Sequence, residues 1–131
     1  MARLHKTGRF IGAQGIAGNS VSVADGRLLG KVWGFVVPAT DATGEIIGIA
    51  AGEQSFAANN QTVAKEKIQY IAADDHARYD IAITGGTLTQ ANEGGFYDLT
   101  AAGIVDGSAT GTQVRLEEFI SATRGIFSAV R

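Results

Sequence analysis

Apolar residues occur along this chain in short runs that glycine interrupts or ends. Clear examples are Val32–Val37, Ile46–Ile49, Tyr79–Ile83 and Val114–Leu116. Such runs are too short for helices and have the length of strands. Turn signals separate them roughly every 8–12 residues, a spacing typical of an all-β sandwich or barrel.

The alternation of apolar and polar positions defines the individual strands more closely. It predicts strands at 21–23, 28–37, 45–51, 78–84, 94–99, 112–120 and 125–130. In 78–84 the alternation is clean, and at 117–119 it slips by one residue, as a β-bulge would cause. The segment 62–71 fits a strand or one short helix, and its Thr, Val, Ile and Tyr favour the strand.

The first twenty residues differ from the rest in being glycine-rich and poor in apolar runs. This composition predicts an extended N-terminal arm over 1–20 and a single compact β-rich body over 21–131, in the form of a β-barrel, a tulip-like barrel or a sandwich. An arm that becomes ordered on contact needs buried apolar area to offset the lost chain entropy. Phe10, Ile11 and Ile16 are its candidate anchors.

Trp33 is the chain's one tryptophan and lies within the most apolar predicted strand, 28–37. Apolar residues at both odd and even positions predict a central strand covered on both faces. Trp33 is therefore expected in the core rather than as a sugar-stacking platform. The exposed aromatic candidates are Tyr70, Phe96 and Tyr97.

The length and composition of the chain exclude several classes of protein. A chain of 131 residues is long enough for one domain with its own core. The absence of cysteine excludes disulfides, thiolate zinc sites and a cysteine nucleophile, and it indicates folding in a reducing cytoplasm. No apolar stretch has the length of a membrane span or a secretory signal, so we expect a soluble, unprocessed chain with no membrane partner.

Charge is low overall but unevenly placed. A net charge of −2 with 18% charged residues does not favour nucleic-acid binding. Arg3, Lys6 and Arg9 precede the first acid, Asp25, whereas acids dominate the predicted body. A basic front end on a mildly acidic body suits contact between copies or docking on an acidic partner, and a solvated tail is the alternative.

No motif predicts a cofactor or a metal. Gly12, Gly15 and Gly18 lack both the spacing of the dinucleotide fingerprint and the Gly-Lys-Ser/Thr of a phosphate loop. The two histidines, His5 and His76, lie far apart in the chain, and a zinc site would have to join different copies.

No motif predicts catalysis either. Asp41, Thr43 and Glu45 resemble the start of a calcium loop, but its twelfth position, which should be Glu, is Gly52. No serine lies in a Gly-x-Ser-x-Gly elbow. We therefore expect a binding or structural protein rather than an enzyme, with a small hydrolase as an alternative that would need a reactive serine.

Four segments in the second half of the chain occur in an order that is also found in a known family. They are 78–84 (RYDIAIT), 87–99 (TLTQANEGGFYDL), 104–107 (IVDG) and 114–119 (VRLEEF). Together with the 32–37 strand, this order resembles the small capsid decoration, or cement, proteins of tailed bacteriophages. The resemblance is one of pattern and includes no motif for the capsid-facing surface.

The resemblance implies a barrel-like β body on the outside of the capsid, bridging copies of the major capsid protein. It further implies a virion protein, made in the host cytoplasm, that acts as a homo-oligomer, a trimer or a dimer. The candidate capsid-binding residues all belong to the arm, as basic contacts and apolar anchors: Arg3, His5, Lys6, Arg9, Phe10 and Ile11. The alternative function is a carbohydrate- or receptor-binding β module of a phage fibre or tail.

Overall fold

β-strands make up nearly all the regular structure of the computed structural model, which describes residues 3–6, 11–74 and 76–131. In chain order the strands are β1 (Arg3–Lys6), β2 (Gly12–Ile16), β3 (Ser22–Val23), β4 (Leu28–Val32), β5 (Phe35–Pro38), β6 (Gly48–Ala50), β7 (Gln54–Ser55), β8 (Lys67–Ala72), β9 (Arg78–Thr84), β10 (Phe96–Leu99), β11 (Val105–Asp106), β12 (Val114–Ser121) and β13 (Arg124–Ala129). Single helical turns occur at η1 (Asn60–Ala64) and η2 (Gln90–Asn92). The predicted all-β class is confirmed.

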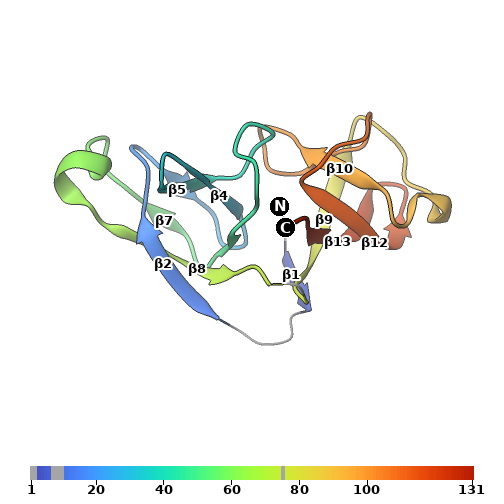
Figure 1. The fold of residues 1–131 in the computed structure, drawn as a ribbon, viewed down its shortest axis with the longest axis horizontal. Coiled ribbons are helices and arrows are strands. Elements are labelled where there is room, and N and C mark those ends of the chain that lie inside the picture. Colours follow the sequence, from blue (N-terminus) through green and yellow to red (C-terminus); the bar gives the residue numbers. More distant parts are fainter. Residues whose placement is uncertain (1–2, 7–10, 75) are drawn as a thin grey trace.

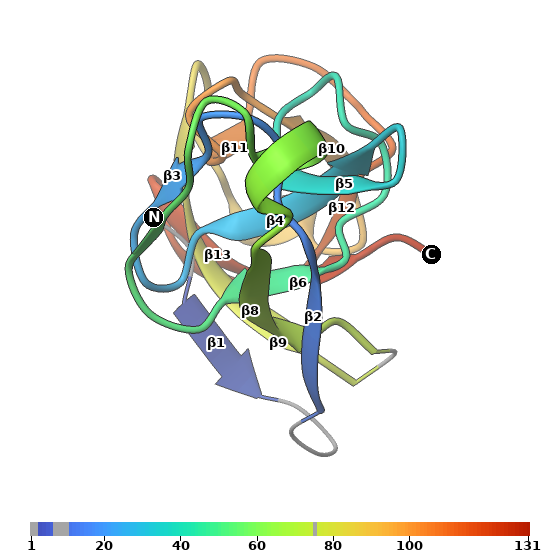
Figure 2. The ribbon, with the colours of Figure 1, turned by 90° about the vertical axis from the view of Figure 1, so that its left-hand side faces the viewer.

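Five strands of the first half form a closed sheet, which we call the first barrel. Its order is β2-β8-β6-β4-β5, and a parallel bridge between Ala17 and Val36 joins the last strand to the first. The interior is filled by small and branched side chains such as Leu29, Val36 and Ile68, all fully buried. Figure 2 shows the strands of this barrel facing the viewer, with the short β3 at one side, and β3 pairs with β7 in a sheet of its own.

Five strands of the second half form the second barrel. Hydrogen-bonded pairs run in the order β9-β11-β10-β12-β13, and β13 pairs back with β9. β9 alternates as the sequence predicts, because Tyr79, Ile81 and Ile83 are buried. In β12, opposite β13, the register shifts after Leu116 and again after Phe119, so the bulge predicted at 117–119 is confirmed.

The two barrels lie side by side (Figure 1), and one of the two buried clusters contains residues of both halves. Leu28 and Ile46 of the first half belong to the same buried cluster as Tyr79 and Phe127 of the second. A continuous core across both halves is the mark of one folding unit rather than two. The predicted single compact domain is confirmed in this form.

The predicted strand 28–37 is wrong in one respect, because it is a hairpin of two strands. β4 and β5 pair antiparallel, with Val32 opposite Phe35, so the chain reverses at Trp33-Gly34. Of the residues typical of turns, this one contains only Gly34. The run of apolar residues therefore continues through the turn and gives no sign of it in the sequence. The predicted Asp25-Gly26 turn is present, but β3 ahead of it pairs with β7 rather than β4.

The segment 62–71, which the sequence left open between strand and helix, contains both. Residues 60–64 form one helical turn, and strand β8 begins at Lys67. The fully buried side chain of Asn60 stabilises the transition from helical turn to strand. Its Nδ2 donates to the carbonyls of Ala17 at 2.9 Å and Glu66 at 3.0 Å, and its Oδ1 accepts from the Glu66 amide at 3.0 Å. A buried side chain that replaces lost backbone partners is a tertiary contact that no local pattern reveals.

The N-terminal segment is partly built into both barrels. The backbone of β1 pairs with β9, with Arg3 opposite Asp80, and β2 is an integral strand of the first barrel. Residues 12–17, predicted as part of the extended arm, are instead part of the first barrel: β2 pairs with β8, and Ala17 pairs with Val36 of β5. Glycine can serve as a strand residue where neighbouring side chains approach closely, as Val36 does at Gly15.

Candidate interaction surface

The most exposed large apolar side chain described is Trp33, at the tip of the β4–β5 hairpin, with 93% of its surface accessible. The expectation that Trp33 lies in the core is therefore wrong. Val32 beside it is 39% exposed, and Phe35 across the hairpin is half-buried. The hairpin thus presents an apolar tip to solvent.

The backbone at this tip adopts a conformation that tryptophan disfavours. Trp33 has φ +53° and Gly34 has φ +83°, both positive as in a type I′ hairpin turn. Asn, Asp or Gly is usual at the first position, and a bulky side chain in the left-handed region costs about 1–2 kcal/mol. Neither this backbone nor the exposed indole stabilises the fold, so both point to a role outside it.

The tip is held rigidly. β4 pairs with β5 over Leu29–Val32 and with β6 on its other side, while Val36 bridges to the strand that closes the barrel. Lys31 is the only charged residue in the two hairpin strands. The backbone that presents the indole is thus fixed before binding and loses little entropy there, as suits an interface anchor.

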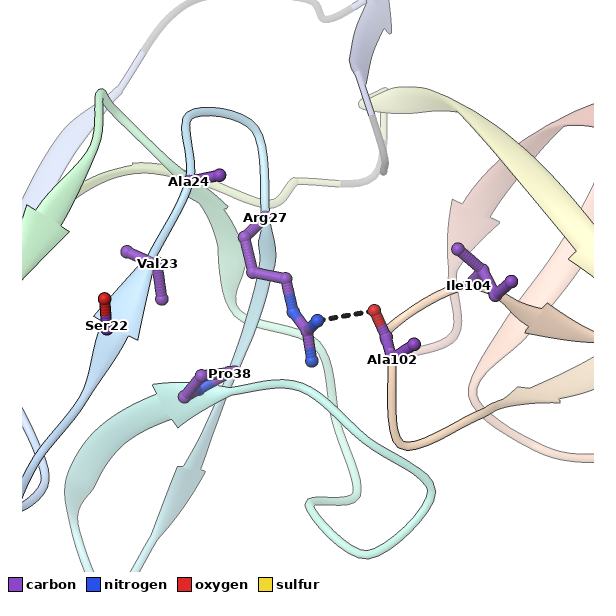
Figure 3. Close-up of a pocket in the computed structure, with 7 residues that line it drawn as sticks. All are labelled: Ser22, Val23, Ala24, Arg27, Pro38, Ala102 and Ile104. Carbon is purple, nitrogen blue, oxygen red and sulfur yellow. Dashed lines mark hydrogen bonds between the residues drawn. The ribbon is translucent and has the colours of Figure 1, made fainter.

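A second feature is a pocket of about 300 Å³ where the two barrels meet. Its lining comes from β3, the following turn, β5 and the β10–β11 loop: Ser22, Val23, Ala24, Arg27, Pro38, Ala102 and Ile104. Figure 3 shows Arg27 reaching from one side of this pocket toward the carbonyl of Ala102 on the other. Most of the lining is apolar, and the guanidinium is its one charge.

Arg27 connects the barrels by hydrogen bonds. Its Nη atoms donate to the carbonyls of Ala102, Ala101 and, at 2.9 Å, Ala39. Burial lowers the pKa of the guanidinium below its usual value. The backbone of Gly103 packs against the same guanidinium, because a Cβ at this glycine would lie 2.6 Å from Arg27 Cζ.

The predicted arm residues are only partly placed. Arg3, His5 and Lys6 lie in β1, whose backbone pairs with β9. Arg9 and Phe10 lie outside the described residues. Ile11, just before β2, is 36% exposed and accepts a hydrogen bond from the Ala72 amide through its carbonyl.

Ion pairs elsewhere are peripheral. Glu117 accepts hydrogen bonds from Arg115 and Ser128. Partial burial raises the pKa of this carboxyl, but the two hydrogen bonds and the arginine charge have the larger effect, so its pKa lies below the usual value. A hydrogen bond from Arg124 to Asp80, with the attraction of the opposite charge, raises the pKa of the guanidinium. Both pairs are partly solvated, so they add little stability.

The described part of the chain contains no group of three or more metal-ligating side chains. Its two helical turns are too short to cross a bilayer. Of the aromatic residues predicted to be exposed, Phe96 is 44% exposed, Tyr97 is buried and Tyr70 is half-buried.

Comparison with known proteins leaves the family open. No protein-family model matches the chain, and no curated protein shows significant similarity to it. The functional argument therefore rests on the residues and geometry above.

Proposed function

We propose that this protein is a capsid decoration protein that binds the outer surface of a phage shell and bridges copies of the major capsid protein. One observation supports it above the others. The segments that resemble decoration proteins fold as successive parts of one closed sheet, in β9, η2 to β10, β11 and β12. The resemblance thus covers four of the five strands of the second barrel, all except β13, and adds the 32–37 segment of the first barrel.

The physical role follows from what such a shell needs. Packed DNA presses outward, and a rigid body placed across a joint between subunits adds contact area there. Many copies bind side by side, so a modest affinity at each site suffices once a neighbour is docked. In this role the basic residues Arg3, Lys6 and Arg9 pair with capsid carboxylates, and Phe10 and Ile11 act as apolar anchors.

Co-sedimentation with emptied phage heads tests the proposal. We expect the protein to pellet with the heads and to raise the temperature at which they fall apart. Reversing Arg3 and Arg9 to Glu should weaken binding at least tenfold, whereas Lys65→Glu with Lys67→Glu, an equal charge change on the first barrel, should leave it unchanged. Heads that neither retain the protein nor gain heat resistance contradict the proposal.

The exposed indole of Trp33 favours a second candidate, a carbohydrate- or receptor-binding module. Stacking on a sugar ring requires polar side chains beside the aromatic face to bind its hydroxyls, whereas Val32, Gly34 and Phe35 surround Trp33 in the chain. A glycan array decides between the two: glycan binding that Trp33→Ala abolishes supports the module, and decoration of glycan-free heads supports the capsid role.

A further inference from the structure

Among the described residues, an exposed apolar projection and a largely apolar recess lie at different places on the surface. The projection is the hairpin tip with Trp33, and the recess is the pocket of about 300 Å³ between the barrels. We propose that Trp33 of one copy inserts into the pocket between the barrels of a second copy. The inference concerns the free protein and does not rest on the proposed function.

The chemistry of the two surfaces matches. Val23, Pro38 and Ile104 offer apolar walls to the indole. Arg27 lines the same pocket and places a cation beside an inserted ring, as a cation–π contact requires. Tryptophan is the best aromatic partner for such a contact.

The charges beside the two surfaces restrict how they can dock, since Lys31 has the same sign as Arg27 in the pocket and the opposite sign to Asp25 beside it. Lys31, exposed, flanks the tip, and Asp25, exposed, follows the pocket residue Ala24 in the turn before β4. Asp25 Oδ1 accepts a hydrogen bond from the Gly52 amide at 2.8 Å, which holds this turn in position. An opposite charge on each side favours one orientation of docking and penalises others.

The area involved sets the expected strength. A buried tryptophan contributes about 150–250 Å², well below the roughly 1,200 Å² of a stable interface, so the indole is an anchor and not the whole contact. We therefore expect weak, concentration-dependent association. Because tip and pocket are different surfaces, the contact is head-to-tail and repeats from copy to copy, as in a ring.

Four matched variants test the contact. Trp33→Ala removes the anchor, and Ala102→Leu fills the pocket from an exposed loop position. Phe96→Ala removes an exposed aromatic elsewhere, and Ala101→Leu adds the same bulk one residue outside the pocket lining. Circular dichroism verifies that each variant is folded.

Sedimentation equilibrium up to millimolar concentration gives the readout. Trp33→Ala and Ala102→Leu should each weaken association by at least about 30-fold, the hot-spot range. The two controls should match the wild type. A mixture of Trp33→Ala with Ala102→Leu should form a one-to-one dimer, because each variant retains the surface that the other lacks.

Fluorescence adds an independent readout, since Trp33 is the only tryptophan of the chain. Its emission should be that of an exposed indole in dilute solution and should shift to shorter wavelength as the protein associates. A wild type that stays monomeric with exposed-indole emission at millimolar concentration overturns the inference. So does association that persists in either defective variant, or failure of the two variants to pair when mixed.

Discussion

Gln113→Leu should destabilise the protein, because Gln113 forms three buried or half-buried hydrogen bonds where the barrels meet. Its side chain is 4% exposed. Nε2 donates to the carbonyls of Thr40 at 2.7 Å and Gly44 at 2.9 Å, and Oε1 accepts from the Leu99 amide at 2.8 Å. The residue thus ties the second barrel to the loop between β5 and β6.

The size of the effect follows from which groups lose their partners. Leucine has nearly the same volume, so the cavity contribution is small and the change is mainly polar. The Leu99 amide, buried, is left without an acceptor, at a cost of about 1–3 kcal/mol. The carbonyls of Thr40 and Gly44 are less buried and regain water in part, so each adds less than about 1 kcal/mol. We expect a total loss of about 2–4 kcal/mol.

Urea unfolding followed by far-ultraviolet circular dichroism measures this loss. Tryptophan emission is unsuitable, since Trp33 is already exposed in the folded chain. Gln14→Leu is the matched control, because Gln14 is exposed and its side chain accepts a hydrogen bond from the exposed side chain of Gln69, and its effect should stay within about 0.5 kcal/mol. A loss below about 0.5 kcal/mol for Gln113→Leu would show that these bonds do not hold the barrels together.

Three further changes test the fold at other points. Asn60→Ala should cost about 2–3 kcal/mol in the same urea assay, since it leaves the buried Ala17 carbonyl and the half-buried Glu66 amide without this partner; an effect no larger than that of the exposed control Thr62→Ala contradicts this. Tyr79→Phe should add about 1 kcal/mol, because the buried phenol has no hydrogen-bond partner among the described residues. Burial and, to a smaller extent, the Asp74 charge raise the pKa of Tyr79 from 10.0 to about 12, while the Arg131 charge lowers it. Because the phenol ionises first in the unfolded chain, the free energy of unfolding of the wild type should fall by about 2–3 kcal/mol between pH 10 and 12. The same loss in Tyr79→Phe refutes the assignment to this residue. Gly48→Ala should prevent folding or cost more than about 3 kcal/mol, since its Cβ would overlap the carbonyl oxygen of Ile71, and a cooperative melt like that of Gly12→Ala, where nothing lies within 4 Å, would contradict the clash.

Much of the fold was predictable where the local pattern and the burial agree. Tyr79, Ile81 and Ile83 alternate in the sequence and are buried, because β9 has one face on the core. The bulge in β12 was equally visible, since an extra residue shifts the alternation by one position.

The hairpin tip was not predictable in the same way. Hydrophobicity assigns Trp33 to the interior, and only Gly34 marks the reversal within an unbroken apolar run. Local pattern records how apolar a residue is but not whether the fold leaves a neighbour to cover it. The exposure of Trp33 is therefore a property of the folded chain.

The sequence by itself determined that this chain is all-β, because strand alternation and glycine turns act over a few neighbouring residues. Only the tertiary structure decided that the strands close into two barrels joined by a buried cluster, and that residues 12–17 pair within the first barrel. It also decided that Trp33 faces solvent while a pocket opens between the barrels. These depend on which strands pair across long separations. Such pairing is set by the packing of the whole chain rather than by any local segment.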